Sequence, residues 1–562
     1  MSDDRDERHA GHVTPEGPEG PEGAEDQEDA GAPRYYVTTT IPYVNARPHL
    51  GFALELVQAD VLARHRRQAG DRVRFLSGTD DNSLKNVLAA EAEGIGVQDF
   101  VDRNAAAFEE LRTPLALSFD DFLRTSSDPR HRAGVERLWR RCAAAGDLYR
   151  KHYEGLYCVG CEQFYTPEDL ADGRCPEHGT PPRPVSEENW FFRLSRYAGT
   201  LHELITTDRL RIQPASRRNE VLSLIAGGLH DFSVSRSHSR ARGWGIPVPD
   251  DPGQVVYVWW DALGNYVTSL GYGDGGADYD RWWARGGRRV HLAGKGVLRF
   301  HAVYWPAMLL SAGLPLPTDI LVHDYLTVGG RKISKSAPAG RPSGRTQTGT
   351  PGSPPDRTPG STPGRTSVDP AELTAAYGTD AVRWWLLRDV PRVGDADFTA
   401  ERLVARADAD LAGGLGNLVF RVVTMIHHYR DGHVPSAPPG EPATEALRAA
   451  RRVAPAAITA ALEDFDFRRA AAALWTIVEE ANRCIEATRP WELAKAERAG
   501  DPAATPRLDA ALAALLDACR DLGTHLTPFL PGAAALITAR CTAPPDAPLP
   551  PPAPLFPRLA EG

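Results

Sequence analysis

The sequence contains no apolar run long enough to cross a membrane as a helix. No stretch of its 562 residues approaches the roughly 18 consecutive apolar residues that a membrane-spanning helix needs. The amino terminus is acidic and lacks the basic-then-apolar order of a secretory signal. With 42% apolar and 25% charged residues, the composition is that of a soluble globular protein. These features exclude the membrane and secreted classes, and we expect a cytoplasmic protein.

Lysine is scarce. Of the 64 basic side chains, 58 are arginine and only six are lysine. An ammonium group is a compact point charge and a guanidinium group is a planar fork, so the positions that keep lysine deserve inspection. Two of the six, Lys332 and Lys335, lie in one pentapeptide, Lys332-Ile333-Ser334-Lys335-Ser336. Taken alone, this segment is better explained as an exposed basic loop than as a binding site.

The 64 basic side chains are also outnumbered by 74 acidic ones, which gives a net charge of −10. At face value this charge argues against a nucleic-acid partner. Residues 1–33, however, hold eleven of the acidic side chains and only two arginines. This segment has Pro-Glu-Gly repeats and no apolar cluster, which predicts a disordered acidic tail. The remainder of the chain is close to neutral, so the net charge excludes no class of partner.

The seven cysteines are few and odd in number, which indicates a reducing compartment in a chain without a secretory signal. Two pairs of metal-ligand residues, Cys158-x₂-Cys161 and Cys175-x₂-His178, lie in one segment rich in glycine and proline. Three thiolates and one imidazole at this spacing complete a closed tetrahedral Zn²⁺ site. We expect one structural zinc ion that folds this module, and the alternative is chance clustering.

The order of predicted elements is typical of a parallel α/β nucleotide-binding fold. Residues 35–41 are β-branched and aromatic and predict a strand, and residues 49–69 follow with helical periodicity. Further strands are predicted at 73–76, 255–260, 290–293 and 319–323, with a helix over about 297–312. The segment Asp369-Pro370-Ala371-Glu372 predicts the start of another helix, with an N-cap, a proline at the first helical position and a capping-box glutamate.

Composition divides the chain into segments. After the tail at 1–33, we predict two halves of one α/β domain at 34–149 and 226–336, separated by a small inserted module at 150–225. Residues 337–368, rich in proline, glycine and arginine, predict a disordered insert. A linking helical segment at 369–399, an α-helical domain at 400–542 and a proline-rich tail at 543–562 complete the prediction.

The first predicted turn, residues 42–52, joins a strand to a helix. A helix amino terminus after a strand is an anion site, because its amide groups and its dipole favour phosphate. Gly51 lets a nucleotide lie against the backbone, and His49 can donate a hydrogen bond to a phosphate. In isolation, a histidine at this position is more often a surface or capping residue.

Together, this turn and the lysine pentapeptide resemble the HIGH and KMSKS signatures of class I aminoacyl-tRNA synthetases, in the same order and context. Longer stretches resemble the methionyl-tRNA synthetases, among them PYVNARPHLG, VRFLSGTDD, YCVGCEQFYTPEDL, YVWWDALGNY, FHAVYWPAML and DYLTVGGRKISKS. The resemblance implies an α/β Rossmann-type parallel-sheet catalytic domain, an inserted zinc-knuckle connective peptide and a C-terminal α-helical anticodon-binding domain. It also implies a monomer.

The resemblance implies a reaction and the residues for it. Methionine and ATP with Mg²⁺ would give methionyl-adenylate, and the methionyl group would then pass to tRNA(Met). His49, Gly51, Lys332 and Lys335 would act on ATP, because the attacked phosphate gains negative charge. Asp80 would hold the methionine ammonium. The side-chain pocket would consist of Tyr43, Trp259, Ala262, Leu263, Tyr266, Val297 and His301.

The helical domain carries residues that match anticodon-reading positions of the family. Asn417 and Arg421 are one turn apart on a predicted helix, and Trp491 follows Arg489-Pro490 in a later loop or helix start. Hydrogen bonds from Asn and Arg and stacking on Trp are how proteins usually read unstacked RNA bases. The alternative is an ordinary helix with a buried asparagine and a salt-bridged arginine.

The sequence also departs from the family pattern around the ATP site. Phe52 stands at the second histidine of HIGH, and Gly296 stands where Gly-Lys-Asp carries its carboxylate. Asp81, Asn82 and Ser83 replace Glu-His-Gly. Three hypotheses follow: a working synthetase with reduced adenylation, a synthetase-like regulatory protein that binds methionine or tRNA, and an adenylating ligase with another acceptor. We favour the first, because the lysines and His49 are retained.

Overall fold

The computed structural model describes residues 31–160, 163–176, 179–333, 368–436 and 441–559. The predictions made for most of the acidic tail and for the insert therefore lie outside the described residues. So do three of the predicted site residues, Cys161, His178 and Lys335.

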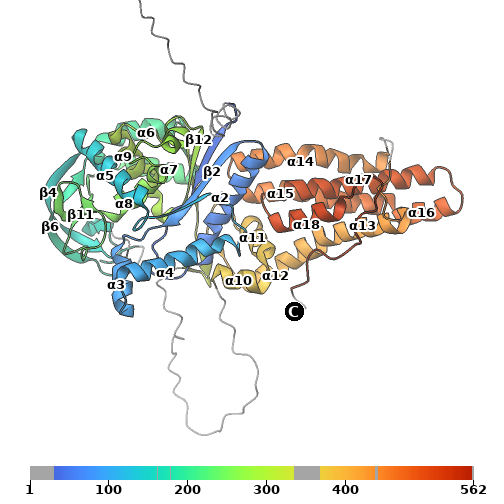
Figure 1. The fold of residues 1–562 in the computed structure, drawn as a ribbon, viewed down its shortest axis with the longest axis horizontal. Coiled ribbons are helices and arrows are strands. Elements are labelled where there is room, and N and C mark those ends of the chain that lie inside the picture. Colours follow the sequence, from blue (N-terminus) through green and yellow to red (C-terminus); the bar gives the residue numbers. More distant parts are fainter. Residues whose placement is uncertain (1–30, 161–162, 177–178, 334–367, 437–440, 560–562) are drawn as a thin grey trace, which may run out of the picture.

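Six strands of the described chain form one parallel sheet, in the order β3-β2-β1-β12-β13-β7. This sheet and the helices around it confirm the predicted Rossmann-type class (Figure 1). Its strands are β1 (Arg34–Thr38), β2 (Arg72–Thr79), β3 (Asp121–Arg124), β7 (Arg211–Gln213), β12 (Arg288–Gly294) and β13 (Asp319–His323). The helices beside the sheet are α2 (Leu50–Gln68), α3 (Leu84–Glu93), α4 (Val97–Glu109), α5 (Pro129–Ala144), α6 (Ala198–Thr206), α7 (Ala215–Ala226), α8 (Val258–Thr268) and α9 (Trp305–Ala312).

The strand order places a ligand crevice beside β1. The next strand along the chain, β2, pairs with β1 on one side, and β12 pairs with β1 on the other side. In open parallel sheets, ligands bind outside the carboxyl ends of the strands where the order reverses. The turn before α2, with His49 and Gly51, and the residues after β12 both lie at this edge.

An antiparallel sheet lies in and around the segment predicted as the inserted module, 150–225. This sheet, in the order β5-β4-β6-β8, is built by β4 (Leu148–Cys158), β5 (Gln163–Tyr165), β6 (Arg183–Phe192) and β8 (Phe232–Ser233). The three residues of β7, however, pair with β13 at the edge of the parallel sheet. So short an edge strand, Arg-Ile-Gln, has no run of β-branched residues by which the sequence could reveal it.

The predicted strand at 255–260 is wrong in its second half. Strand β11 covers Asp251–Val256, pairing with β9 (Ser235–Ser237) and β10 (Pro247–Val248), and α8 begins at Val258. Nearly every residue of α8 is buried, and a helix buried on all sides is apolar all round. The aromatic and β-branched letters that suggested a strand therefore reflect burial of a helix.

The carboxyl half of the described chain is helical, as predicted (Figure 1). A small sheet of β14 (Leu326–Val328), β15 (Arg331–Lys332) and β16 (Ala396–Asp397) precedes and flanks the linking helices. Asp369 caps the first of these through the backbone N–H of Ala371, as predicted. The helices are α10 (Pro370–Tyr377), α11 (Thr379–Arg388), α12 (Ala400–Arg406), α13 (Asn417–Arg430), α14 (Glu445–Glu463), α15 (Phe467–Thr488), α16 (Pro490–Arg498), α17 (Ala504–His525) and α18 (Pro531–Cys541).

One continuous apolar core joins the two halves. It extends from α2 and α4 through α11 into the C-terminal helices, and a second core lies on the other face of the sheet. The proline-rich segment after α18 also packs on this bundle, because Leu549 is buried and its N–H donates to the carbonyl of Gly432 at 2.8 Å. Among the described residues, one helical run, Ala400–Arg430, is long and apolar enough by composition to cross a membrane. Its residues include Leu403, Leu411 and Leu418 of the first core.

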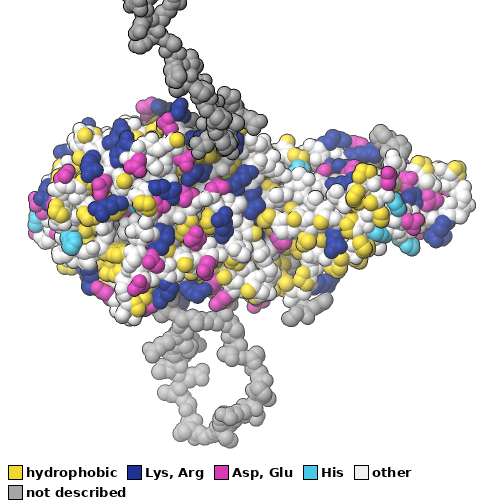
Figure 2. Space-filling model, in the orientation of Figure 1, with side chains coloured by type: hydrophobic (Ala, Val, Ile, Leu, Met, Phe, Trp, Pro, Cys, Tyr) yellow, Lys and Arg dark blue, Asp and Glu magenta, His cyan; other side chains and the backbone are white. Residues whose placement is uncertain are grey.

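The surface carries both signs of charge. Figure 2 shows basic and acidic side chains interspersed over the face in view. This agrees with the near-neutral charge of the chain beyond its acidic tail.

Candidate active site

The first element of the site is the turn before α2. His49 is the extended N-cap residue of α2, and its imidazole folds over Gly51. A Cβ at position 51 would lie 3.0 Å from His49 Cε1 and 3.1 Å from Nδ1, which is tighter than nearly all real contacts. Glycine is therefore needed here so that the histidine can lie across the start of the helix, where the amide groups and dipole favour a phosphate.

The second element brings Tyr43 and Asp80 together. The two residues form an isolated parallel β-bridge, and the N–H of Asp80 donates to the carbonyl of Pro42 at 3.0 Å. Asp80 is 2% exposed. The ring of Tyr43 meets the edge of Trp259 with centroids 6.3 Å apart, and Lys85 Nζ lies 5.2 Å from the centre of the same ring. Lys85 was not among the predicted site residues, because nothing in its sequence context separates it from an ordinary helix-surface lysine.

The third element is α8 with the π-helical turn Phe300–Tyr304. Trp259, Ala262 and Tyr266 lie on α8, and the ring of Trp259 stacks on Phe300 with centroids 3.7 Å apart. The Tyr266 hydroxyl lies 2.8 Å from His301 Nε2. The structure thus joins four of the predicted pocket residues, Tyr43, Trp259, Tyr266 and His301, through direct contacts or a shared helix.

The protonation of His301 follows from its partners. Its Nδ1 lies 2.9 Å from the carbonyl oxygen of Val297, which can only accept, so Nδ1 carries the proton. Nε2 is then the acceptor, and the Tyr266 hydroxyl donates to it. Burial lowers the pKa of His301 and raises that of Tyr266, so both groups are neutral near pH 7. The pocket therefore presents an aromatic, uncharged wall, which suits a thioether side chain.

A second buried histidine supports this wall and was missed from the sequence. His291 stacks on Tyr266 with centroids 4.0 Å apart, and Trp305 Nε1 donates to its Nε2 at 3.2 Å. Its Nδ1 consequently carries the proton toward Thr38 Oγ1, at 2.7 Å. Burial lowers the pKa of His291 well below the usual value. Only the pairing of β1 with β12 brings these residues together, so no local pattern could have identified them.

A buried polar network holds the loop after Asp80 against α8. Asn82 Nδ2 donates to Asp261 Oδ2 at 2.7 Å and to the carbonyl of Thr125 at 3.2 Å. Asp261 also pairs with His131, and both side chains are buried. Asn82, which departs from the family pattern, thus has a defined structural partner on the helix that carries Trp259.

Lys332, the described lysine of this segment, lies on a hairpin of β14 and β15 that β16 fixes. Lys332 is on β15, and Asp397 of β16 accepts hydrogen bonds from Thr327 Oγ1 at 2.6 Å and from the N–H of Gly330 at 2.9 Å. The hydrogen bond from Thr327 and the amide of Gly330 lower the pKa of Asp397. Just before this hairpin, His323 ties the end of β13 to α2, because its Nε2 lies 2.9 Å from Glu55 Oε2.

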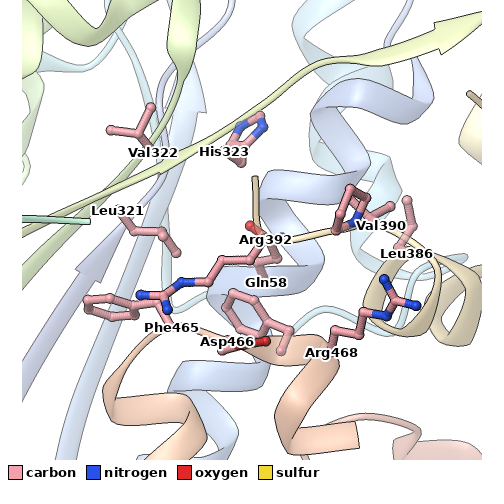
Figure 3. Close-up of a pocket in the computed structure, with 12 residues that line it drawn as sticks. Gln58, Leu321, Val322, His323, Leu386, Val390, Arg392, Phe465, Asp466 and Arg468 are labelled. Atoms are coloured by element: carbon pink, nitrogen blue, oxygen red, sulfur yellow. The ribbon is translucent and has the colours of Figure 1, made fainter. Parts of the chain in front are cut away.

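A pocket between the sheet and the helical domain lies next to this ion pair (Figure 3). It is lined by residues of α2, β13, α11 with the loop after it, and the α14–α15 connection, including Gln58, His323, Arg392 and Phe465. The described residues predicted to bind methionine and ATP are not among its lining. We assign this pocket to the domain interface.

The two described zinc-knuckle cysteines lie close together. Cys158 ends β4 and is 2% exposed, and Cys175 is 1% exposed in the loop between β5 and β6. Both contact Thr180, through Cys158 Sγ at 3.9 Å and the backbone N–H of Cys175 at 2.9 Å. Tyr165 and Leu170 pack around them. Two buried thiols at adjacent loops fit a structural Zn²⁺ site, and no group of three metal-ligand side chains is found within the described residues.

The predicted anticodon residues lie on α13 and α16 of the helical domain. Asn417 begins α13 and is exposed, Arg421 follows one turn later, and Trp491 is 37% exposed in the first turn of α16. Arg421 Nη2 lies 3.4 Å from Glu486 Oε1 on α15, shortly before Trp491. Asn417 is thus not a core residue, whereas Arg421 is salt-bridged, as the alternative interpretation expected.

Comparison with known proteins decides the family. The family model described as "tRNA synthetases class I (M)" matches residues 35–183, 160–340 and 360–423. The methionine–tRNA ligase of Brucella melitensis is 38% identical over 547 residues, covering 94% of this chain and 98% of its own. The chain belongs to the methionyl-tRNA synthetase family. The ligase of Mycobacterium bovis is 37% identical over 93% of this chain and 98% of its own.

Solved structures agree. Mycobacterium tuberculosis methionyl-tRNA synthetase in complex with methionyl-adenylate matches with a TM-score of 0.84 and 36% identity, over 94% of this chain and 100% of that one.

Phe52 remains a departure from the HIGH signature of the family. Its ring is 6% exposed and packs against Phe108 of α4, with centroids 5.3 Å apart, so position 52 belongs to the core and supplies no hydrogen-bond donor to a phosphate.

Proposed function

We propose that this chain activates methionine with ATP and transfers it to tRNA(Met). In the first step, a methionine carboxylate oxygen attacks the α-phosphorus of ATP and pyrophosphate leaves. In the second step, a 3′-terminal hydroxyl of the tRNA attacks the acyl carbon of methionyl-adenylate, and AMP leaves. The observation that carries this proposal is the joined set of Tyr43, Asp80 and Trp259 at the carboxyl edge of the parallel sheet, in a chain of this family.

The pocket residues act by position and charge. The Asp80 carboxylate binds the ammonium of methionine, because a buried carboxylate attracts a cation more strongly than an exposed one. The rings of Tyr43 and Trp259 contact the thioether chain, and the neutral Tyr266–His301 pair forms the end of the pocket without an unpaired charge.

The phosphate residues act on the charge that develops at phosphorus. His49 and the amino terminus of α2 beside Gly51 stabilise the α-phosphate in the transition state, since fixed donors there need no reorganisation. Lys332 and Lys335 neutralise the β- and γ-phosphates, together with the Mg²⁺ that accompanies ATP. Phe52 removes one donor from this set, and we expect reduced adenylation, because one such donor is worth roughly 10²–10³ in rate.

Two further assignments extend the proposal. One structural Zn²⁺ is held by Cys158, Cys161, Cys175 and His178, and the donor set suits zinc because thiolate and imidazole are its preferred ligands. Asn417, Arg421 and Trp491, on α13 and α16 of the helical domain, read the anticodon. We also propose that the enzyme acts in the cytoplasm as a monomer.

The test is methionine-dependent ATP–pyrophosphate exchange followed by charging of tRNA(Met). Asp80→Asn weakens one charged hydrogen bond, worth about 1.5–3 kcal/mol, so KM for methionine should rise about 10- to 100-fold while KM for ATP is unchanged. The matched control is Asp280→Asn, an exposed aspartate paired with Arg285 away from the site. Absence of exchange in the wild-type chain would refute the enzyme assignment.

A further inference from the structure

The side chain of Tyr325 explains why position 296 is glycine. Tyr325 lies between β13 and β14, and a Cβ at position 296 would lie 2.0 Å from the Tyr325 hydroxyl oxygen. The next ring atoms are farther away, with Cζ at 3.2 Å and Cε1 at 3.8 Å. Any side chain at 296 would displace the tyrosine, so the glycine is a structural requirement of where this ring lies.

The same ring contacts two of the few lysines. Lys332 Nζ lies 3.7 Å from the ring centroid, and Lys295 Nζ lies 4.6 Å from it. Both distances are within the range of cation–π attraction. Lys295 Nζ is also 2.6 Å from Asp395 Oδ1. One aromatic ring therefore connects the residue after β12 with the hairpin that carries the lysine segment.

The backbone of Tyr325 is held independently of the lysines. Its N–H donates to Asp395 Oδ1 at 3.0 Å, and its carbonyl accepts from the N–H of Ala396 at 3.0 Å. These two bonds fix the residue between the main sheet and β16. The ring is therefore the anchored partner, and the long, flexible lysine side chains are the groups that it orders.

We propose that Tyr325 is a positioning residue that orients the ammonium of Lys332 toward the phosphates of ATP, and that Gly296 is glycine so that this ring fits. The face of an aromatic ring attracts an ammonium group without cancelling its charge. Lys332 is thereby held at the carboxyl edge of the sheet with its positive charge available to a polyanionic substrate. The inference rests on the proposed role of Lys332 in ATP binding.

The first test separates the ring from the hydroxyl. Tyr325→Leu removes the aromatic face, and kcat/KM for ATP in pyrophosphate exchange should fall about threefold to tenfold. KM for methionine should not change. Tyr325→Phe keeps the face and should remain within about twofold of the wild type. Equal losses in the two variants, or a wild-type value for Tyr325→Leu, would overturn the proposal, as would a parallel change in KM for methionine.

The second test uses the contact at position 296. Gly296→Ala should lower exchange, because its Cβ meets the tyrosine hydroxyl. Gly296→Ala combined with Tyr325→Phe should recover most of the loss, since removal of that oxygen leaves 3.2 Å to the nearest ring atom. Gly227→Ala is the matched control, because a Cβ there has no neighbour closer than 3.5 Å. No recovery in the double variant would contradict the assigned contact.

Lys332→Met distinguishes failure of the inference from failure of the assignment beneath it. If Lys332→Met loses exchange and Tyr325→Leu does not, the positioning role is wrong and the ATP role of Lys332 stands. If Lys332→Met exchanges like the wild type, the assignment of Lys332 fails, and the inference fails with it. In a Lys332→Met background, Tyr325→Leu should cost less than in the wild type, because the contact between the ring and Lys332 is already lost.

Discussion

Replacing Arg383 by methionine should destabilise the junction between the two halves of the protein. Arg383 lies on α11 and is fully buried, and its Nη2 is 2.8 Å from Asp60 Oδ2 on α2. Its guanidinium also donates to three backbone carbonyls, those of Phe529 at 2.7 Å, Leu115 at 2.9 Å and Pro528 at 3.0 Å. One side chain thus ties α2, beside the parallel sheet, to the turn between α17 and α18 of the helical domain.

The size of the stability loss follows from which hydrogen bonds the partners of Arg383 keep in the variant. In Arg383→Met, Asp60 still accepts from Arg64 Nε at 2.8 Å and from Ser118, so its charge retains partners. The three carbonyls lose their donor inside the core, at about 1–3 kcal/mol for each that stays unsatisfied. Removing one member of a buried ion pair costs about 3–5 kcal/mol in all. We therefore expect a loss of about 3–5 kcal/mol in the free energy of unfolding.

The assay is urea unfolding followed by circular dichroism and tryptophan fluorescence, fitted with separate transitions because the protein has more than one domain. Arg103→Met is the matched control, since Arg103 is 54% exposed and pairs with Glu93, which is 49% exposed. An exposed pair of this kind is worth about 0–1 kcal/mol. tRNA charging by Arg383→Met should also fall more than pyrophosphate exchange, because charging needs both domains in register. An Arg383→Met protein no less stable than Arg103→Met would refute the reasoning.

Three further predictions concern pH, metal and tRNA. Burial alone lowers the pKa of His323, but its hydrogen bond and charge interaction with Glu55 outweigh this and raise the pKa above the usual value. The stability that this pair contributes is therefore complete below about pH 6.5 and is lost as the pH rises through the raised pKa. The Tm difference between the wild type and Glu55→Gln should therefore shrink from pH 6 to pH 9. A Tm difference that stays constant over this range would contradict the prediction. Cys158→Ser should abolish zinc in the purified protein by elemental analysis, whereas Cys142→Ser should keep it; full zinc in both variants rejects the site. Trp491→Ala should lower kcat/KM for tRNA charging about 5- to 100-fold, as expected for the loss of one stacked base, with exchange unchanged; an equal fall in both reactions contradicts an anticodon role.

The sequence was sufficient where local chemistry decides the structure. The N-cap at Asp369 and the strand–turn–helix around His49 are both short-range patterns, and the structure confirms them. It was insufficient where burial overrides local preference. The segment with Trp259 has strand-like letters but forms a buried helix, and β7 is too short to show a period.

The site divides in the same way. Resemblance to the family led to Asp80 and Tyr266, because both lie in stretches that match it. It did not lead to His291 or Tyr325, which act through partners far away in the sequence: His291 with Thr38, and Tyr325 beside Gly296. From sequence alone, Gly296 is only a missing carboxylate. In the structure, the glycine at 296 leaves room for the side chain of Tyr325.

The sequence by itself determined the family and the classes of residue that the reaction needs, because those residues occur in contiguous stretches whose order survives divergence. Only the tertiary structure decided which charges are available. It made His301 neutral by burying it, fixed the tautomer by placing Nδ1 against a carbonyl oxygen, buried Arg383 among three carbonyls, and placed Lys332 over an aromatic ring. Protonation and electrostatic strength depend on burial and on partners brought together by the fold, and neither is encoded in the spacing of residues along the chain.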